Sequence, residues 1–183
     1  MQNSATLKKQ LRKEIRSLKV SLTDADKRTA ADVVMRELLS DSRLRECTNI
    51  VLFWSMPDEI STPAIVDKLN ELHDVYLPVI VGDDLQFRLY EGLESMRAEE
   101  QYGIFEPTSA VSLQSGAPQT AIVVPGMAFT QSGCRMGRGR GYYDRILSRF
   151  PDAYKIGICY KCQMVSSLPV EPHDIMMDRV VCG

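Results

Sequence analysis

Short apolar runs alternate along the chain with amphipathic segments of helical periodicity, and this alternation restricts the possible folds. Within 49–54 and 121–124 every residue but Asn49 is apolar, as expected of strands buried on both faces of a sheet. Further strands are expected near 75–81, with an interruption at Pro78, and near 85–90, 155–160 and 178–182. Because helical segments lie between many of these strands, we predict an α/β sheet with helices on both faces.

Helices are expected at three places before the middle of the chain. Residues 6–19 carry one apolar helical face and a basic opposite face, the apolar side chains being Leu7, Leu11, Ile15 and Leu18. A second helix is expected to begin at Thr23, with Asp26 completing a variant of the capping box. Thr62 is expected to cap a third helix that begins at Pro63.

Composition is typical of one ordinary globular domain. The chain has 183 residues, of which 44% are hydrophobic and 25% charged, and we predict a single domain over 1–183. No apolar stretch reaches the roughly 18 residues of a membrane-spanning helix, and the first residues lack the apolar region of a secretory signal. A formal charge of −2 gives no general attraction for nucleic acid. We therefore expect no membrane or nucleic-acid partner, and we expect a cytoplasmic monomer.

The five cysteines are odd in number and scattered along the chain. Cys159 and Cys162 have the spacing of a metal or redox pair, but no second pair of this kind accompanies them. We favour free thiols over a structural zinc site, which fits a reducing compartment.

Residues 135–144 form the most unusual stretch, Arg-Met-Gly-Arg-Gly-Arg-Gly-Tyr-Tyr-Asp. Glycine at every second position lets backbone amides approach a ligand, and the arginines between them supply forked positive donors. An apolar strand precedes the stretch, and a helical pattern containing Ile146, Leu147 and Phe150 follows it. Unpaired amides and the dipole at the start of a helix favour anions. We predict a cradle for a polyphosphate.

Two other interpretations of this stretch stay open. It matches neither the P-loop pattern nor the dinucleotide-binding pattern of spaced glycines, so it is not one of the common nucleotide motifs. A glycine-rich surface turn with solvated arginines is one alternative. Binding of a single-stranded nucleic acid is another, which the charge balance and the ordered helix pattern disfavour.

Two carboxylates are candidates for a magnesium site. Asp144 lies among the arginines, where it would either stabilise the first helical turn or bind Mg²⁺ together with substrate phosphates. Asp178 near the end of the chain would supply a second carboxylate. The sequence alone does not bring the two residues together.

Two further places have residues suited to ligand binding. Lys8, Arg12 and Arg16 follow one another at intervals of four and form one basic ridge, which is either a solvated face or a phosphate contact. Glu59 comes just after the first buried strand, where ligands gather in α/β sheets. Trp54 at the same strand end would either pack against a flat ring system of a ligand or fill the core.

Several short motifs spread along nearly the whole chain occur together in one enzyme family. They lie at residues 8–12, 55–59, 102–107, 124–129 and 133–145, with His173, Asp174 and Asp178 near the end. Together they resemble 5-formyltetrahydrofolate cyclo-ligase, also called methenyltetrahydrofolate synthetase. The chain departs from the usual pattern of that family at Thr130, where an aspartate is common, and at Cys162, where an acidic residue is frequent.

The resemblance implies a three-layer α/β/α sandwich with a mostly parallel central sheet. It also implies an ATP- and Mg²⁺-dependent enzyme that converts 5-formyltetrahydrofolate to 5,10-methenyltetrahydrofolate and releases ADP and phosphate. ATP would phosphorylate the formyl oxygen, and N10 of the folate would then attack the activated carbon. Such a reaction depends mainly on positioning and on neutralising phosphate charge.

The resemblance assigns residues to each ligand. ATP would contact Lys8, Lys9, Gln10, Leu11, Arg12, Arg135, Met136, Gly137, Arg138, Gly139, Arg140, Gly141, Tyr142 and Tyr143. The folate would contact Trp54, Glu59, Arg138, Gly139, Arg140, Gly141 and Tyr142. Mg²⁺ would be bound by Asp144 and Asp178, and the catalytic residues would be Arg138, Tyr142 and Glu59. The alternatives are a relative that acts on another substrate and a protein that only sequesters a nucleotide or folate.

Overall fold

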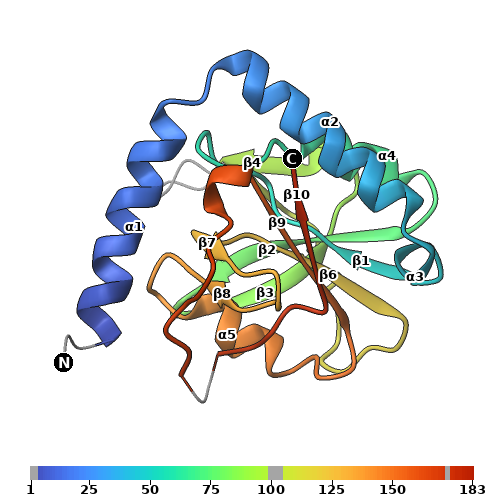
Figure 1. Cartoon of the computed structure of the whole chain (residues 1–183). Helices are drawn as coiled ribbons and strands as arrows, with labels where there is room; N and C mark the ends of the chain where they lie inside the picture. The colour runs from blue at the N-terminus through green and yellow to red at the C-terminus, as the bar shows by residue number, and fades with distance from the viewer. Residues whose placement is uncertain (1–3, 99–104, 172–173) are drawn as a thin grey trace.

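The computed structural model describes residues 4–98, 105–171 and 174–183, and within them a six-stranded sheet forms the centre of the molecule (Figure 1). Its order is β10-β9-β6-β1-β2-β3. The strands are β1 (Asn49–Val51), β2 (Asp74–Val81), β3 (Asp84–Leu89), β6 (Thr120–Val124), β9 (Tyr154–Cys159) and β10 (Arg179–Cys182). The β2–β3 pair is antiparallel and the other pairs are parallel, so the predicted mostly parallel sheet is confirmed.

Helices cover both faces of the sheet. Side chains of one strand alternate between the two faces, so Ile50 packs into one hydrophobic core and Val51 into the other. Helices α2 (Asp24–Ser40), α3 (Ser42–Arg45) and α4 (Pro63–Asn70) pack against the first face, and α5 (Tyr142–Leu147) against the second (Figure 1). This arrangement confirms the three-layer α/β/α sandwich.

Helix α1 (Ser4–Val20) lies beside the sandwich (Figure 1). Its buried Ile15 packs with Met127, Ala128 and Met136 in a third, smaller core. Two of these partners belong to a hairpin of two short strands, β7 (Ala128–Phe129) and β8 (Arg135–Met136). The helix is thereby placed next to the arginine-glycine stretch.

The strand order changes direction between β1 and β6. From β1 the chain continues to β2 on one side, whereas β6, β9 and β10 lie in succession on the other. In doubly wound sheets the carboxyl ends of strands at such a point leave a crevice where ligands bind. The loops that follow β1 and β6 therefore flank the expected binding position.

Local signals predicted most helix starts and strands. Helix α2 begins after Thr23, whose Oγ1 accepts from the Asp26 amide at 3.1 Å while Asp26 Oδ2 accepts from the Thr23 amide at 2.9 Å. The strand predicted over 49–54 ends at Val51, and the predicted interruption at Pro78 is wrong. Strand β1 pairs with β2 only as far as Tyr76, so the pairing with β1 does not require the N–H that Pro78 lacks.

Thr62 is the N-cap residue of α4, as predicted, although its side chain does not cap the helix. Helix α4 begins at Pro63 as expected, but the Thr62 hydroxyl makes no cap bond. It donates to the carbonyl oxygen of Phe53 at 2.5 Å and accepts from the Ser55 amide at 3.0 Å. Thr62 therefore closes the base of the loop that carries Glu59.

Several short elements lack a clear sequence signal. They are β4 (Met96–Ala98), β5 (Phe105–Pro107), the 3₁₀ turns η1 (Leu93–Ser95) and η2 (Lys161–Gln163), and the β7–β8 hairpin. Residues 102–104 of one family motif, and His173 of another, lie outside the described residues. Among the described helices, none combines the length and the apolar character required to cross a bilayer.

Candidate active site

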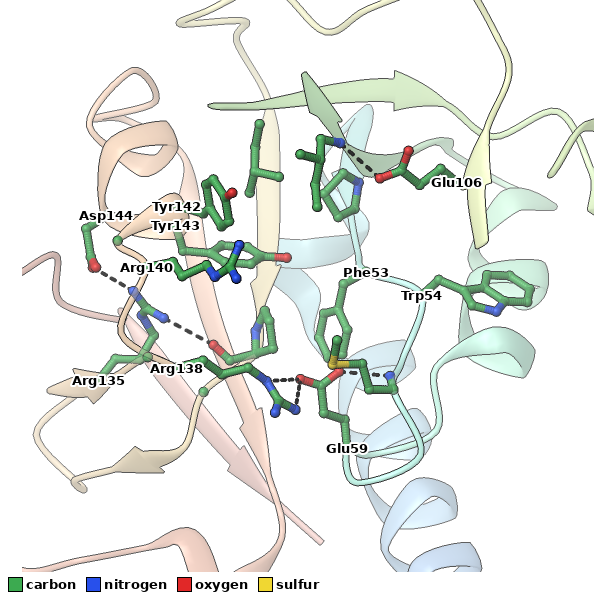
Figure 2. Close-up of a pocket in the computed structure, with 18 residues that line it drawn as sticks. Phe53, Trp54, Glu59, Glu106, Arg135, Arg138, Arg140, Tyr142, Tyr143 and Asp144 are labelled. Carbon is green, nitrogen blue, oxygen red and sulfur yellow. Dashed lines mark hydrogen bonds and ion pairs between the residues drawn. The ribbon is translucent and has the colours of Figure 1, made fainter. Parts of the chain in front are cut away.

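A pocket of about 250 Å³ lies at the carboxyl ends of β1 and β6, and it has two unlike walls (Figure 2). The arginine-glycine stretch and the start of α5 form one wall. The loop after β1 and the facing parts of β2 and β3 form the other, which is largely apolar. The lining residues include Phe53, Trp54, Met56, Glu59, Pro78, Ile80, Leu85, Glu106, Pro125, Gly126, Arg135, Gly137, Arg138, Arg140, Gly141, Tyr142, Tyr143 and Asp144.

Arg138 connects the two walls. Its Nη2 atom lies 2.8 Å from Glu59 Oε1 and 2.6 Å from Asp58 Oδ1, and both carboxylates come from the loop after β1. Burial by itself lowers the pKa of Arg138, but the bonds to Asp58 and Glu59 outweigh it and raise that pKa. Arg138 therefore stays positively charged where it joins the two walls of the pocket.

Arg135 is held more deeply than Arg138. Its side chain is 3% exposed, and its Nη2 atom donates to Asp144 Oδ1 at 2.6 Å. Its guanidinium carbon also lies 5.7 Å from the centre of the Tyr143 ring. Burial, followed by repulsion from the Glu59 carboxylate, raises the pKa of the Tyr143 hydroxyl far above its ordinary range. Tyr143 therefore stays protonated and able to donate.

Two glycines of the stretch adopt a backbone conformation that favours glycine. Gly139 has a φ of +108° and Gly141, directly before α5, has a φ of +69°, both in the left-handed region that favours glycine. Arg145 braces this backbone by donating to the Arg140 carbonyl oxygen at 3.0 Å, and its guanidinium lies 5.2 Å from the Tyr142 ring centre. Met136 is buried against Ile15 and is not among the residues that line the pocket.

Helix α1 reaches the arginine-glycine stretch through Arg12. The Arg12 Nε atom donates to the Gly137 carbonyl oxygen at 2.9 Å. Lys8 forms ion pairs with Glu171 at 3.1 Å and Asp174 at 3.2 Å. The other residues of the predicted ATP segment differ in setting: Lys9 and Gln10 are exposed, and Leu11 packs beside Ile15.

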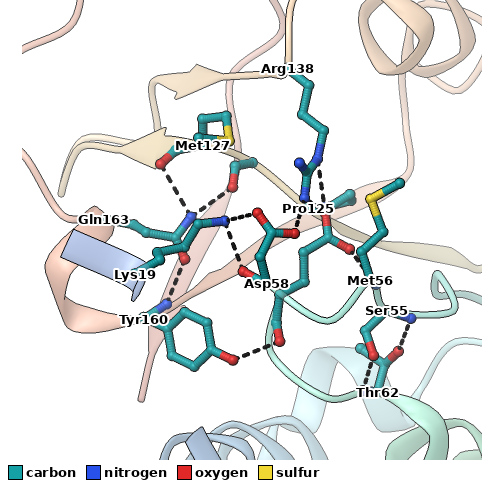
Figure 3. Close-up of polar contacts among 12 residues, drawn as sticks. Lys19, Ser55, Met56, Asp58, Thr62, Pro125, Met127, Arg138, Tyr160 and Gln163 are labelled. Atoms are coloured by element: carbon teal, nitrogen blue, oxygen red, sulfur yellow. Dashed lines mark hydrogen bonds and ion pairs between the residues drawn. The ribbon is translucent and has the colours of Figure 1, made fainter. Parts of the chain in front are cut away.

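The loop after β1 places Glu59 and Trp54 on the second wall (Figure 2). Glu59 Oε2 accepts from the Met56 amide at 3.0 Å, which holds the carboxylate at the pocket. The Tyr160 hydroxyl donates to the Glu59 carbonyl oxygen at 2.6 Å (Figure 3). The ring centre of Trp54 lies 6.4 Å from that of Phe105, so an aromatic surface continues from the pocket towards β5.

The two predicted magnesium ligands have different surroundings. Asp144 lines the pocket and pairs with Arg135. Asp178 precedes β10, and its Oδ2 atom accepts from the Lys155 amide near the amino end of β9 at 2.8 Å. Within the described part of the chain no group of three or more His, Cys, Asp or Glu residues forms a metal site.

Sequence reasoning missed three charged residues near the pocket. Lys19 is buried and binds Asp58, which in turn binds Arg138 (Figure 3). Glu106 lines the pocket, and its Oε1 atom accepts from the Ile80 amide at 2.9 Å. Lys19 follows Leu7, Leu11 and Ile15 at the same interval of four, so its place on the apolar face was an available signal.

Thr130 and Cys162 have local roles. The Thr130 hydroxyl accepts from the Cys134 amide at 3.0 Å and closes the turn between β7 and β8. Because an aspartate can accept the same turn bond, this departure leaves the hairpin intact. Cys162 packs at the edge of the core on the α2 side of the sheet.

Comparisons with known proteins agree over almost the full length. A model of the 5-formyltetrahydrofolate cyclo-ligase family matches residues 4–183. The 5-formyltetrahydrofolate cyclo-ligase of Haemophilus influenzae is 30% identical over 184 residues, covering 96% of this chain and 97% of that protein. The Saccharomyces cerevisiae protein of the same name is 27% identical, covering 100% of this chain and 96% of its own.

A solved structure shows the same similarity. The Aquifex aeolicus 5,10-methenyltetrahydrofolate synthetase matches with a TM-score of 0.85 at 26% identity, covering 96% of this chain and 89% of that one. The sequence and structural similarities thus cover the sheet, helix α1 and the arginine-glycine stretch together.

Proposed function

Since this chain belongs to the 5-formyltetrahydrofolate cyclo-ligase family, we propose that it closes 5-formyltetrahydrofolate to 5,10-methenyltetrahydrofolate while ATP is converted to ADP and phosphate. The observation that carries this proposal is the pocket with two unlike walls. Binding of a nucleoside triphosphate requires cations and amide donors, whereas binding of a reduced folate requires apolar surface and a few polar groups. The arginine-glycine wall supplies the cations and amides, and the Trp54–Glu59 wall supplies the apolar surface and the polar groups.

The nucleotide is assigned to the wall formed by α1 and the arginine-glycine stretch. Arg12 and Arg140 bring guanidinium groups to this wall, and the backbone amides of 137–141 are open to close approach. We expect the triphosphate to lie along the stretch, with its terminal phosphate towards Arg138. Lys8, Lys9 and Gln10 would contact the outer part of the nucleotide.

The folate is assigned to the wall formed by the loop after β1. Glu59 would accept hydrogen bonds from the pterin, and Trp54 would lie against a flat part of the substrate. Tyr142 and Arg138 line the region between the walls, where the formyl oxygen and the terminal phosphate would meet. These residues orient the two substrates for in-line transfer.

The reaction needs no nucleophilic side chain. The formyl oxygen attacks the terminal phosphorus and ADP leaves, which turns that oxygen into part of a phosphate leaving group. N10 then attacks the formyl carbon, loses its proton, and the C–O bond breaks with release of phosphate. Arg138 and Arg140 would hold the transferring phosphate and offset its charge.

Mg²⁺ fits this site as a companion of the nucleotide. That ion usually takes one or two carboxylates together with substrate phosphates and water, and when bound it neutralises phosphate charge. Asp144 lines the pocket and is the carboxylate suited to it. Asp178 is not among the residues that line the pocket, so we assign the role to Asp144 alone.

The test is a direct assay of ring closure. The purified protein is mixed with ATP, Mg²⁺ and 5-formyltetrahydrofolate, and the methenyl chromophore is followed by absorbance. Growth of the chromophore that requires ATP supports the proposal. Binding of either ligand without chromophore would identify a sequestering protein, and ATP hydrolysis only with other substrates would identify a different ligase. We further propose a monomeric cytoplasmic enzyme; all five cysteines are free, as is usual in a reducing compartment.

A further inference from the structure

Lys19 is a buried cation that the proposed reaction does not use. Its side chain is 3% exposed, and within α1 only Ile15 is buried as well. Its Nζ atom donates to the Asp58 carbonyl oxygen at 2.8 Å and to Asp58 Oδ2 at 2.6 Å (Figure 3). Burying a lysine is costly unless the charge is paired, so this position is built around Asp58.

Asp58 stands between two cations. One carboxylate oxygen, Oδ2, accepts from Lys19, while the other, Oδ1, accepts from Arg138 at 2.6 Å. Asp58 and Lys19 also line a second cavity, together with Arg16, Val20 and Lys27, whereas Arg138 lines the pocket itself. Asp58 therefore connects a cation outside the active site with one inside it.

The sharing of Asp58 controls how firmly Arg138 is held. Arg138 is paired with both Asp58 and Glu59. To bind a phosphate, its guanidinium must move part of the way from these carboxylates towards the phosphate. With Lys19 present, Asp58 keeps a partner when Arg138 moves. Without Lys19, the Asp58 carboxylate would depend on Arg138 for its pairing, and the attraction between the two would oppose that movement.

We propose that Lys19 is a positioning residue of the active site, which neutralises Asp58 and so leaves Arg138 free to bind the terminal phosphate of ATP. The release of Arg138 also leaves Glu59 Oε1 open to the folate, because that oxygen is otherwise bound to Arg138 at 2.8 Å. Lys19 touches neither substrate in this arrangement. The inference rests on the proposed ATP-dependent reaction.

The first test is Lys19→Met, which keeps the length of the buried side chain and removes its charge. We expect the KM for ATP to rise about five- to tenfold, the size of one coupled ion pair, with kcat changed by less than about twofold. Lys27→Met removes the same charge from the same second cavity without a hydrogen bond to Asp58, and should leave both constants unchanged. Equal effects of the two variants would overturn the inference.

The decisive test is the double variant Lys19→Met/Asp58→Asn. It removes the charge that retains Arg138, so the KM for ATP should return to within about twofold of the parent value, a strongly non-additive result. If Lys19 only held the loop through its bond to the Asp58 carbonyl oxygen, the double variant would be at least as impaired as the single one. That outcome would overturn the inference.

Two further comparisons keep the result interpretable. Should Lys19→Met fail to fold, Asp58→Asn alone decides, because release of Arg138 predicts a KM for ATP at or below that of the parent protein. A KM raised as much as in Arg138→Ala would contradict the inference. Absence of turnover in the parent protein would instead refute the proposed function, so the two failures are distinguishable.

Discussion

The Nε atom of Arg12 lies 2.9 Å from the carbonyl oxygen of Gly137 and donates a hydrogen bond to it. This bond joins the first helix to the arginine-glycine stretch, and Nη2 of the Arg12 guanidinium lies beside Gly139. Burial, with a smaller contribution from Arg16, lowers the pKa of Arg12, which still leaves it charged at neutral pH. Arg12 is therefore both a brace for the stretch and a candidate phosphate ligand.

Replacing Arg12 with alanine should impair the use of ATP. We expect kcat/KM for ATP to fall by about 1.5–3 kcal/mol of transition-state stabilisation, as for the loss of a charge-assisted hydrogen bond. Lys13→Ala is the matched control, because Lys13 is the next residue of α1 and is exposed. Steady-state kinetics with varied ATP measures both. An equal loss in the control would mean that only the overall charge of α1 matters.

Asp144→Asn separates the ion pair from the metal role. Arg135 is 3% exposed and Asp144 21% exposed at the side chain, so loss of the charge should lower the free energy of unfolding by about 1–3 kcal/mol. If Asp144 also binds Mg²⁺ with ATP, the Mg²⁺ concentration for half-maximal rate should rise. Asp178→Asn should leave the magnesium titration unchanged. Overlaid titration curves for all three proteins would restrict Asp144 to its pair with Arg135.

The buried carboxylate of Asp41 should make stability depend on pH. Burial opposes the charge of Asp41, but bonds from the Leu44 amide, Arg179 and Tyr154 outweigh it and lower the pKa of this carboxyl. A lowered pKa adds stability above the ordinary aspartate range, and the gain is lost as pH falls through the native pKa. Asp41→Asn should thus cost about 1–3 kcal/mol at pH 7, and the difference should shrink between pH 5 and about pH 2.

Urea unfolding at several pH values measures this difference between the parent protein and Asp41→Asn. Asparagine keeps an acceptor for the Leu44 amide but loses the second acceptor, which faces Arg179 and Tyr154, so only the part of the difference that changes with pH reports the charge. A difference that stays constant over the whole range would show that the charge of Asp41 contributes nothing.

Gly133→Ala should destabilise the protein far more than Gly82→Ala. Both glycines have positive φ, +92° and +61°, so both substitutions carry backbone strain of about 1–2 kcal/mol. A Cβ atom on Gly133 would also lie 2.2 Å from the Met177 carbonyl oxygen, whereas one on Gly82 would meet open space. We expect a total loss of about 3 kcal/mol or more at Gly133, measured by urea unfolding. Equal losses at the two sites would show that the contact relaxes freely.

Features that depend on neighbouring residues were predictable from the sequence. The capping box of Thr23 and Asp26 forms within three residues, and the apolar run 121–124 suffices to define a strand buried on both faces. Family motifs placed Glu59, Arg138 and Tyr142 in one site, and all three line the same pocket.

Features that depend on distant partners were not predictable in the same way. Thr62 has the residue type and position of a helix cap, but its hydroxyl is used by Phe53 and Ser55. Lys19 and Lys13 belong to the same basic pattern of α1, yet one is buried and the other exposed. Helical periodicity places Lys19 on the face of Leu11 and Ile15, but it contains no information about the partner of Lys19, Asp58, which lies 39 positions away.

The contacts of α1 follow a regular order with a consequence for folding during synthesis. From its carboxyl end to its amino end, Lys19 binds Asp58, Arg12 binds Gly137 and Lys8 binds Asp174. Each step towards the first residue thus meets a partner made later by the ribosome. During synthesis the partners of α1 therefore become available in order, from its last turn to its first. A chain that stops before Glu171 would lack β10 and the partners of Lys8, while the partner of Arg12, Gly137, would already be present.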